Sequence, residues 1–271
     1  MFQSPNMRAR SLRMADRGQR TALITGASSG IGAAVAGQLA REGWNVVLVG
    51  RDAARLDAVA VSCQAAGARC SAASLDIRDH AAFAALVADV ERSSAIDLFV
   101  SNAGVLDGRH DGECVESAEA ARDVLDINLM AAVEAIHAIL PGMRARRSGR
   151  IILVSSLAAF APLADAPAYS ASKFGLLAYG VALREALHGE GVSVTVVCPG
   201  YVATRMAAVH LGHRPWELSA SQAAAKILKA AAKGKEIYGF PAHLYWSSRI
   251  SLFVPELLRR AFTKGIRFHV G

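Results

Sequence analysis

The chain has 271 residues, of which 53% are hydrophobic and 20% charged, and this composition excludes a disordered protein and favours one large α/β domain. Its longest apolar runs, such as residues 151–154, are too short to cross a bilayer, and the basic N-terminus lacks the apolar segment of a secretory signal. The net charge of +7 is concentrated at the ends, since residues 1–20 and 241–271 each carry +4 and residues 21–240 carry −1, which argues against a nucleic-acid-binding body.

Residues 1–20 are predicted to form a basic, mobile arm, and residues 21–240 a single domain in which short apolar runs alternate with longer helical patterns. The predicted strands cover residues 22–25, 46–49, 68–74, 96–101, 151–155, 192–197 and 235–239. The predicted helices cover residues 30–42, 52–66, 79–92, 117–146, 168–189 and 221–233. This alternation is typical of right-handed βαβ units, so a doubly wound, seven-stranded parallel sheet is predicted. Residues 241–271 break the alternation and are predicted to be a short helical extension split at Pro255.

The first predicted strand is followed by a turn that contains Gly26, Gly30 and Gly32. Glycine at these positions permits a tight turn, a close approach to a pyrophosphate, and close packing of the next helix on the strand. The first N–H groups of that helix would then face the phosphates of a dinucleotide. The spacing differs from the common dinucleotide fingerprint, and a glycine-rich turn without a ligand is the alternative.

Tyr169 and Lys173 lie four residues apart in a predicted helix and therefore share one face of it. An ammonium group beside a phenol lowers the pKa of the phenol, and such a tyrosine is a suitable general acid or base for a carbonyl or alcohol oxygen. Ser155 and Ser156 end a predicted strand, at the edge of the sheet where ligands bind in such folds. Taken alone, the Tyr169–Lys173 pair would be interpreted as an ordinary contact on a helix surface.

Together with four further motifs, these segments resemble the classical short-chain dehydrogenase/reductase family, which has a Rossmann-type fold. The matching motifs are TGASSGIG at 25–32, Asp76 in LDI, NAG at 102–104, Asn128 in DINL, Ser156, YSASK at 169–173 and PGYVAT at 199–204. They occur in the family's order and at its usual intervals, over about residues 21–205. The resemblance implies an enzyme that transfers a hydride between a nicotinamide cofactor and a carbonyl or secondary alcohol.

The resemblance assigns catalytic roles to Asn128, Ser156, Tyr169 and Lys173. Tyr169 is the implied proton donor to the substrate oxygen, which Ser156 would also hold. Lys173 would lower the pKa of Tyr169 and bind the nicotinamide ribose, and Asn128 would hold a water that links Lys173 to bulk solvent. The implied cofactor contacts are Gly26, Ser28, Ser29, Gly30, Ile31, Gly32, Arg51, Asp76, Ile77, Asn102, Ala103, Gly104, Tyr169, Lys173, Pro199, Gly200, Val202 and Thr204. No metal site is expected, because the eight histidines show no ligand spacing.

The end of the second predicted strand bears on the choice of cofactor. In this family, the acid that binds the ribose 2′-hydroxyl of NAD would occupy the position of Gly50, and the next residue is Arg51. Glycine removes the repulsion that an acid would exert on a 2′-phosphate, and arginine supplies a planar cation for it. A preference for NADP(H) is therefore predicted, with NAD(H) as a possible second cofactor and Ser29 as the donor of one hydrogen bond at most. The alternative for Arg51 is a solvated loop cation.

The substrate is less well determined. Residues 205–219 include Met206, Leu211 and Trp216, which predict an apolar lining. Six aromatic residues fall in the last part of the chain: Phe240, Tyr245, Trp246, Phe253, Phe262 and Phe268. With the five basic side chains there, they could form an interfacial helix on an anionic membrane. Packing over the substrate pocket or at a subunit contact is the favoured interpretation.

The leading hypothesis is an NADP(H)-dependent ketone or aldehyde reductase with Tyr169 as general acid or base. A membrane-associated reductase of a lipid or 3-oxoacyl substrate is one alternative, and a catalytically silent dinucleotide sensor or scaffold is another. Helices 117–146 and 168–189 match those that pair in the family's oligomers, so a homodimer or homotetramer is expected. Four cysteines without metal-type spacing favour a reduced, cytoplasmic protein.

Overall fold

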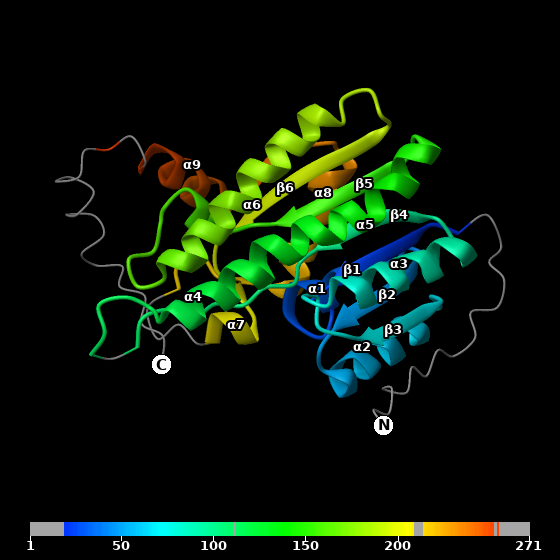
Figure 1. Ribbon diagram of the computed structural model, residues 1–271, viewed down its shortest axis with the longest axis horizontal. Helices are drawn as coiled ribbons and strands as arrows, with labels where there is room; N and C mark the ends of the chain where they lie inside the picture. Colours follow the sequence, from blue (N-terminus) through cyan, green and yellow to red (C-terminus); the bar gives the residue numbers. More distant parts are fainter. Residues whose placement is uncertain (1–18, 111, 209–213, 252–253, 255–271) are drawn as a thin grey trace.

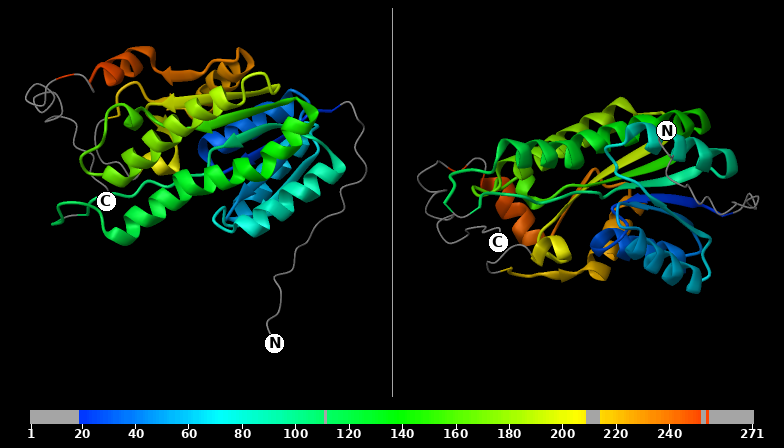
Figure 2. Two further views of the ribbon diagram at one scale, coloured as in Figure 1. Left: turned by 45° about the horizontal axis from the view of Figure 1, so that its top comes forward. Right: turned by 60° about the horizontal axis from the view of Figure 1, so that its bottom comes forward.

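The computed structural model describes residues 19–110, 112–208, 214–251 and 254. It confirms the predicted α/β fold, with a seven-stranded parallel sheet in the order β3-β2-β1-β4-β5-β6-β9 and helices on both faces (Figure 1, Figure 2). The strands are β1 (Thr21–Thr25), β2 (Asn45–Gly50), β3 (Cys70–Ser74), β4 (Ile96–Ser101), β5 (Gly149–Val154), β6 (Val192–Pro199) and β9 (Ile237–Phe240). The strand order reverses between β1 and β4, and ligands of open α/β sheets bind in the crevice at such a point.

The helices form one layer on each face of the sheet. One layer contains α1 (Gly30–Arg41), α2 (Ala53–Ala65) and α8 (Ala220–Ala232), and the other contains α3 (His80–Ser93), α4 (Ala118–Leu125), α5 (Ala131–Arg146) and α6 (Pro167–Ala186). The central strands are runs of Val, Ile and Leu because both of their faces are covered. Successive residues therefore enter different cores, as Leu23 and Ile24 do.

The predicted helix 117–146 is interrupted by one wide π turn over Asp126–Met130, between α4 and α5. Asn128 lies in this turn and is buried. The combined helix Ala118–Arg146 is long and apolar enough to cross a membrane by length and composition, which the short apolar runs did not suggest. Residues such as Ile136 and Ile139 face the core, so packing within the domain accounts for its apolar character.

Three short elements near the end of the domain were not predicted. β7 (Val202–Ala203) and β8 (Leu218–Ser219) pair in parallel outside the main sheet, and α7 (Arg205–Ala208) follows β7. The C-terminal extension contains α9 (Ala242–Ser251). Residues 1–18 and 255–271, and with them the predicted arm and the predicted split at Pro255, lie outside the described residues.

Candidate active site

The glycine-rich turn leads from β1 into α1 at the crevice. Gly26 and Gly30 have φ values of 65° and 57°, in the left-handed region that favours glycine. A Cβ on Gly32 would overlap the carbonyl oxygen of Gly26, so a larger residue would push α1 away from the turn. Ser29, which precedes α1, makes no capping hydrogen bond. The first N–H groups of α1 are therefore available to an anionic ligand.

The end of β4 is joined to the same turn through Thr25. The Thr25 hydroxyl accepts hydrogen bonds from the backbone N–H groups of Asn102 and Ala103, at 3.0 and 3.1 Å. The side-chain nitrogen of Asn102 donates to the carbonyl groups of Thr25 and Gly26, both at 3.1 Å. These bonds hold the segment from Asn102 to Gly104 along the crevice.

Asn128 connects the segment after β4 to α6. Its side-chain oxygen accepts from the Val105 N–H at 2.8 Å, and its side-chain nitrogen donates to the Val105 carbonyl at 2.9 Å and to the Ser172 hydroxyl at 3.1 Å. Both N–H bonds of the side chain are thus used, and its oxygen has accepted one hydrogen bond. A Cβ on Gly104 would lie 3.0 Å from the Asn128 oxygen and 3.4 Å from Lys173 Nζ, so Asn128 also borders the lysine.

The three other predicted catalytic residues converge from β5 and α6. Tyr169 and Lys173 are buried on α6, and Ser156 follows β5. Lys173 Nζ donates to the Val154 carbonyl at 3.1 Å and lies 5.7 Å from the centre of the Tyr169 ring. Ser155 also lines the cavity, but its hydroxyl anchors the helix, because it donates to the Lys173 carbonyl at 2.7 Å. The structure thus brings Ser156, Tyr169 and Lys173 together.

The pKa of Tyr169 differs from the sequence-based expectation. Burial raises this pKa, and a hydrogen bond with Ser156 opposes the increase. Burial also lowers the pKa of Lys173 to about 8. The expected lowering of the tyrosine pKa by the lysine is absent from this arrangement, because the Lys173 ammonium is directed at the Val154 carbonyl.

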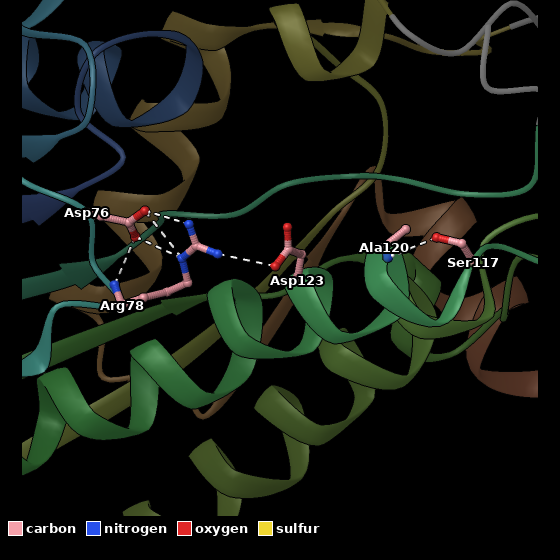
Figure 3. Close-up of polar contacts among 5 residues, drawn as sticks. All are labelled: Asp76, Arg78, Ser117, Ala120 and Asp123. Carbon is pink, nitrogen blue, oxygen red and sulfur yellow. Dashed lines mark hydrogen bonds and ion pairs between the residues drawn. The ribbon is translucent and has the colours of Figure 1, made fainter.

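The opposite end of the crevice lies after β2 and β3. Arg51 is exposed and forms no salt bridge with a described residue. The neighbouring Asp52 caps α2 and is paired with Arg55 at 2.6 Å. Asp76 accepts hydrogen bonds from Arg78, which lower the pKa of its carboxyl group (Figure 3). Among the described residues at this end of the crevice, Arg51 is therefore a cation without a salt bridge.

A third group of residues lies after β6. It consists of Pro199, Gly200, Val202 and Thr204. The Gly200 N–H donates to the Phe240 carbonyl at 2.8 Å, which fixes the turn. Thr204 lies over the glycine-rich turn, since a Cβ on Gly30 would be 2.9 Å from Thr204 Cγ2.

These groups surround one cavity of about 830 Å³ at the carboxyl ends of the strands. Every predicted site residue lines the cavity except Gly32 and Asn128, which contact residues that line it. A family model described as short chain dehydrogenase matches residues 20–213. The chain belongs to the short-chain dehydrogenase family. It is therefore an oxidoreductase that interconverts carbonyl and alcohol groups.

Relatives of this short-chain dehydrogenase agree in length and fold. An uncharacterized oxidoreductase of Myxococcus xanthus is 35% identical over 94% of this chain and 100% of its own length. The ketoacyl reductase HetN of a Nostoc species is 35% identical over 78% of this chain and 75% of its own. The solved actinorhodin polyketide ketoreductase with NADPH superposes with a TM-score of 0.77 at 29% identity, over 86% of this chain and 99% of that one.

The sequence motifs did not predict all of the residues that line the cavity. Its further lining residues include Leu106, Leu157, Ala161, Leu163, Tyr201, Pro215, Leu244 and Ser248. Tyr201 lies within the PGYVAT motif, and the others lie in loops, in the short turn after β5 and in α9, where no motif marks them. Met206 lines the cavity as expected, Leu211 lies outside the described residues, and Trp216 is exposed and packs on His243.

The predicted aromatic tail is only partly described. Phe240 and Tyr245 are buried, with the Tyr245 ring 5.6 Å from that of Phe160, whereas Trp246 is exposed. Phe253, Phe262 and Phe268 lie outside the described residues. Leu244 and Ser248 line the cavity, so α9 forms part of its wall.

Proposed function

We propose that this short-chain dehydrogenase reduces a ketone or aldehyde with NADPH. The observation that carries the proposal is the convergence of Ser156, Tyr169 and Lys173 on the cavity that begins at the glycine-rich turn. The positive φ angles of that turn and the uncapped start of α1 fit a pyrophosphate. When bound, the nicotinamide supplies the hydride, and this chain supplies positions and a proton.

The proton side of the reaction belongs to Tyr169 and Ser156. Both hydroxyl groups would donate to the substrate carbonyl oxygen and stabilise the negative charge that develops on it. The raised pKa of Tyr169 keeps its phenol protonated at neutral pH, as a proton donor requires. Lys173 would return a proton to the phenolate. A silent sensor would need none of these groups, so we do not favour that alternative.

The preference for NADPH rests on Gly50 and Arg51. The cavity has no carboxylate at Gly50 to repel a 2′-phosphate, and Arg51 has a free guanidinium group beside it. Two solved relatives support the choice of cofactor. The actinorhodin ketoreductase and a short-chain dehydrogenase of Sphingobium yanoikuyae were both determined with NADPH, the second with a TM-score of 0.75 at 26% identity over 92% of this chain and 96% of that one.

A 3-oxoacyl compound is the first substrate class to test. Relatives named as ketoacyl reductases support this choice, and the apolar residues that line the cavity beside Tyr169 suit an acyl chain. A membrane location is not required for it.

The test measures the loss of NADPH absorbance with 3-oxoacyl thioesters, ketones, aldehydes and quinones. Tyr169→Phe should bind NADPH as the wild type does and lose roughly 10²- to 10⁴-fold in kcat, because general acid catalysis is removed. Tyr179→Phe, on the same helix and outside the cavity, should retain full activity. Substantial turnover by Tyr169→Phe would contradict the proposed mechanism.

A further inference from the structure

Arg78 donates hydrogen bonds to the carboxylate of Asp76, which lines the cavity, from its backbone N–H and from two guanidinium nitrogens (Figure 3). The Arg78 backbone N–H donates to Asp76 Oδ1 at 3.0 Å, Nη2 donates to Oδ2 at 2.7 Å, and Nε is shared between the two oxygens at 3.1 and 3.2 Å. These four contacts fall two on each oxygen and so use the roughly four acceptor positions of the carboxylate. The charge of Asp76 is therefore compensated within the protein.

A second carboxylate fixes Arg78 from the other side. Its Nη1 lies 3.2 Å from Asp123 Oδ1 on α4. The start of α4 is fixed in turn, because the Ser117 hydroxyl accepts from the Ala120 N–H at 3.1 Å (Figure 3). Asp76, Asp123 and the nearby Asp126 together raise the pKa of Arg78. The guanidinium is thus held in place and permanently charged.

Arg51 lies next to Asp76 because β2 and β3 pair side by side. Gly50 is opposite Ser74, and the Ser74 hydroxyl donates to the Arg51 carbonyl at 3.1 Å. The charge of Arg51 contributes to the low pKa of Asp76, although less than the hydrogen bonds from Arg78. Without Arg78, the Asp76 carboxylate would be an uncompensated negative charge beside Arg51. It would attract that guanidinium and repel a 2′-phosphate.

We propose that Arg78 sets the preference for NADPH: it takes up the charge of Asp76 and thereby leaves Arg51 free for the ribose 2′-phosphate. This inference rests on the proposed function and adds a specificity-determining residue that acts through its neighbours. A comparison of NADPH with NADH distinguishes an effect of the Arg78 charge from an effect of the loop conformation. A residue that merely held the loop in place would affect NADPH and NADH alike, since the two share everything except the 2′-phosphate.

The test compares dissociation constants for NADPH and NADH by calorimetry, without substrate. Arg78→Met should weaken NADPH binding by roughly tenfold or more, about 1.4 kcal/mol, and NADH binding by roughly twofold or less. Asp76→Asn combined with Arg78→Met should restore the wild-type ratio, because no charge is left to compensate. Arg78→Lys keeps the charge without the fork and should retain most of the preference. Arg78→Gln replaces the methionine variant if that variant does not fold.

The matched control is Arg92→Met, which removes an arginine from an exposed ion pair with Asp89 on neighbouring α3. It should leave both dissociation constants unchanged. Equal weakening of NADPH and NADH by Arg78→Met, or failure of the double variant to restore the ratio, would overturn the inference. A wild-type protein that prefers NADH would instead overturn the proposed function, so the two failures are distinguishable.

Discussion

Burial acts in opposite directions on the two side chains at the centre of the site. It lowers the pKa of Lys173 to about 8 and raises that of Tyr169. Below a pH of about 8, both groups therefore hold their protons. That is the state from which a proton can pass to a carbonyl oxygen and be replaced.

We expect kcat for carbonyl reduction to be constant below a pH of about 8 and to fall as the pH rises above it, because Lys173 then loses its proton. The rate falls with rising pH because Lys173 acts in its protonated form, and the protonated fraction declines above its pKa. Stopped-flow measurement of the hydride-transfer step across this range tests the expectation. A rate that rises with pH across the same range would contradict the assigned role of Lys173.

Arg51→Ala should raise the KM for NADPH by roughly 10- to 100-fold and leave the KM for NADH almost unchanged, because only NADPH carries the phosphate. Steady-state kinetics with both cofactors measures the difference. Arg92→Ala is the control, because Arg92 is an exposed arginine of α3 that lies outside the cavity. An equal effect of the two substitutions would indicate that Arg51 acts only as a solvated loop cation.

At the scale of elements, the position of α6 determines where Tyr169 and Lys173 lie. α6 packs directly on the sheet at Gly180, where a Cβ would overlap Val196 Cγ2 and lie 2.7 Å from Leu153 Cδ1. The helix can approach β5 and β6 closely only because this residue has no side chain. The catalytic face of α6, about two to three turns earlier, depends on that approach.

Gly180→Ala should therefore lower the free energy of unfolding by about 1–3 kcal/mol through overpacking, and it should reduce kcat by displacing α6. Gly37→Ala is the control on α1, where the nearest atom to an added Cβ is the flexible end of Arg41 at 3.6 Å. That substitution should stabilise the protein by up to about 1 kcal/mol through helix propensity. Urea unfolding of both variants provides the comparison, and a stabilising Gly180→Ala would contradict this packing.

The elements that could be predicted from sequence are those whose pattern is local. The buried strands show continuous apolar runs, and the glycine-rich turn and the Tyr169–Lys173 pair each have a characteristic spacing. The π turn at Asn128 has no such pattern, because the residues around it read as continuous helix. The ion pairs of Arg78 also escaped prediction, since Asp123 is 45 residues away in sequence and meets it only in the folded chain.

For the whole molecule, two exposed apolar side chains are relevant to self-association. Met130 and Phe174 are 46% and 52% exposed. Their neighbours Leu129 and Gly175 are adjacent, because a Cβ on Gly175 would lie 2.9 Å from Leu129 Cδ2. The two exposed side chains therefore lie on the joint surface of the long helix 118–146 and α6. We propose this surface as the contact in a homodimer.

Phe174→Glu should then shift the molar mass measured by light scattering after size-exclusion chromatography from dimer to monomer, since a buried unpaired charge is costly at an interface. Val61→Glu, which alters a still more exposed apolar residue on α2, should leave the mass unchanged. A wild-type monomer, or a dimer that persists in Phe174→Glu, would contradict the proposal.

The β7–β8 ribbon has a consequence for how the enzyme could be diversified. Val202 pairs with Leu218, and the Leu218 N–H donates to the Tyr201 carbonyl at 3.0 Å, so the chain returns to the point that it left. Lengthening a segment whose two ends are already pinned together costs only about 0.6 kcal/mol per doubling of its length. Thr204 and the rest of the cofactor end would stay in place. Segments exchanged between Arg205 and Glu217 should therefore alter which carbonyl substrates are accepted without rebuilding the dinucleotide site.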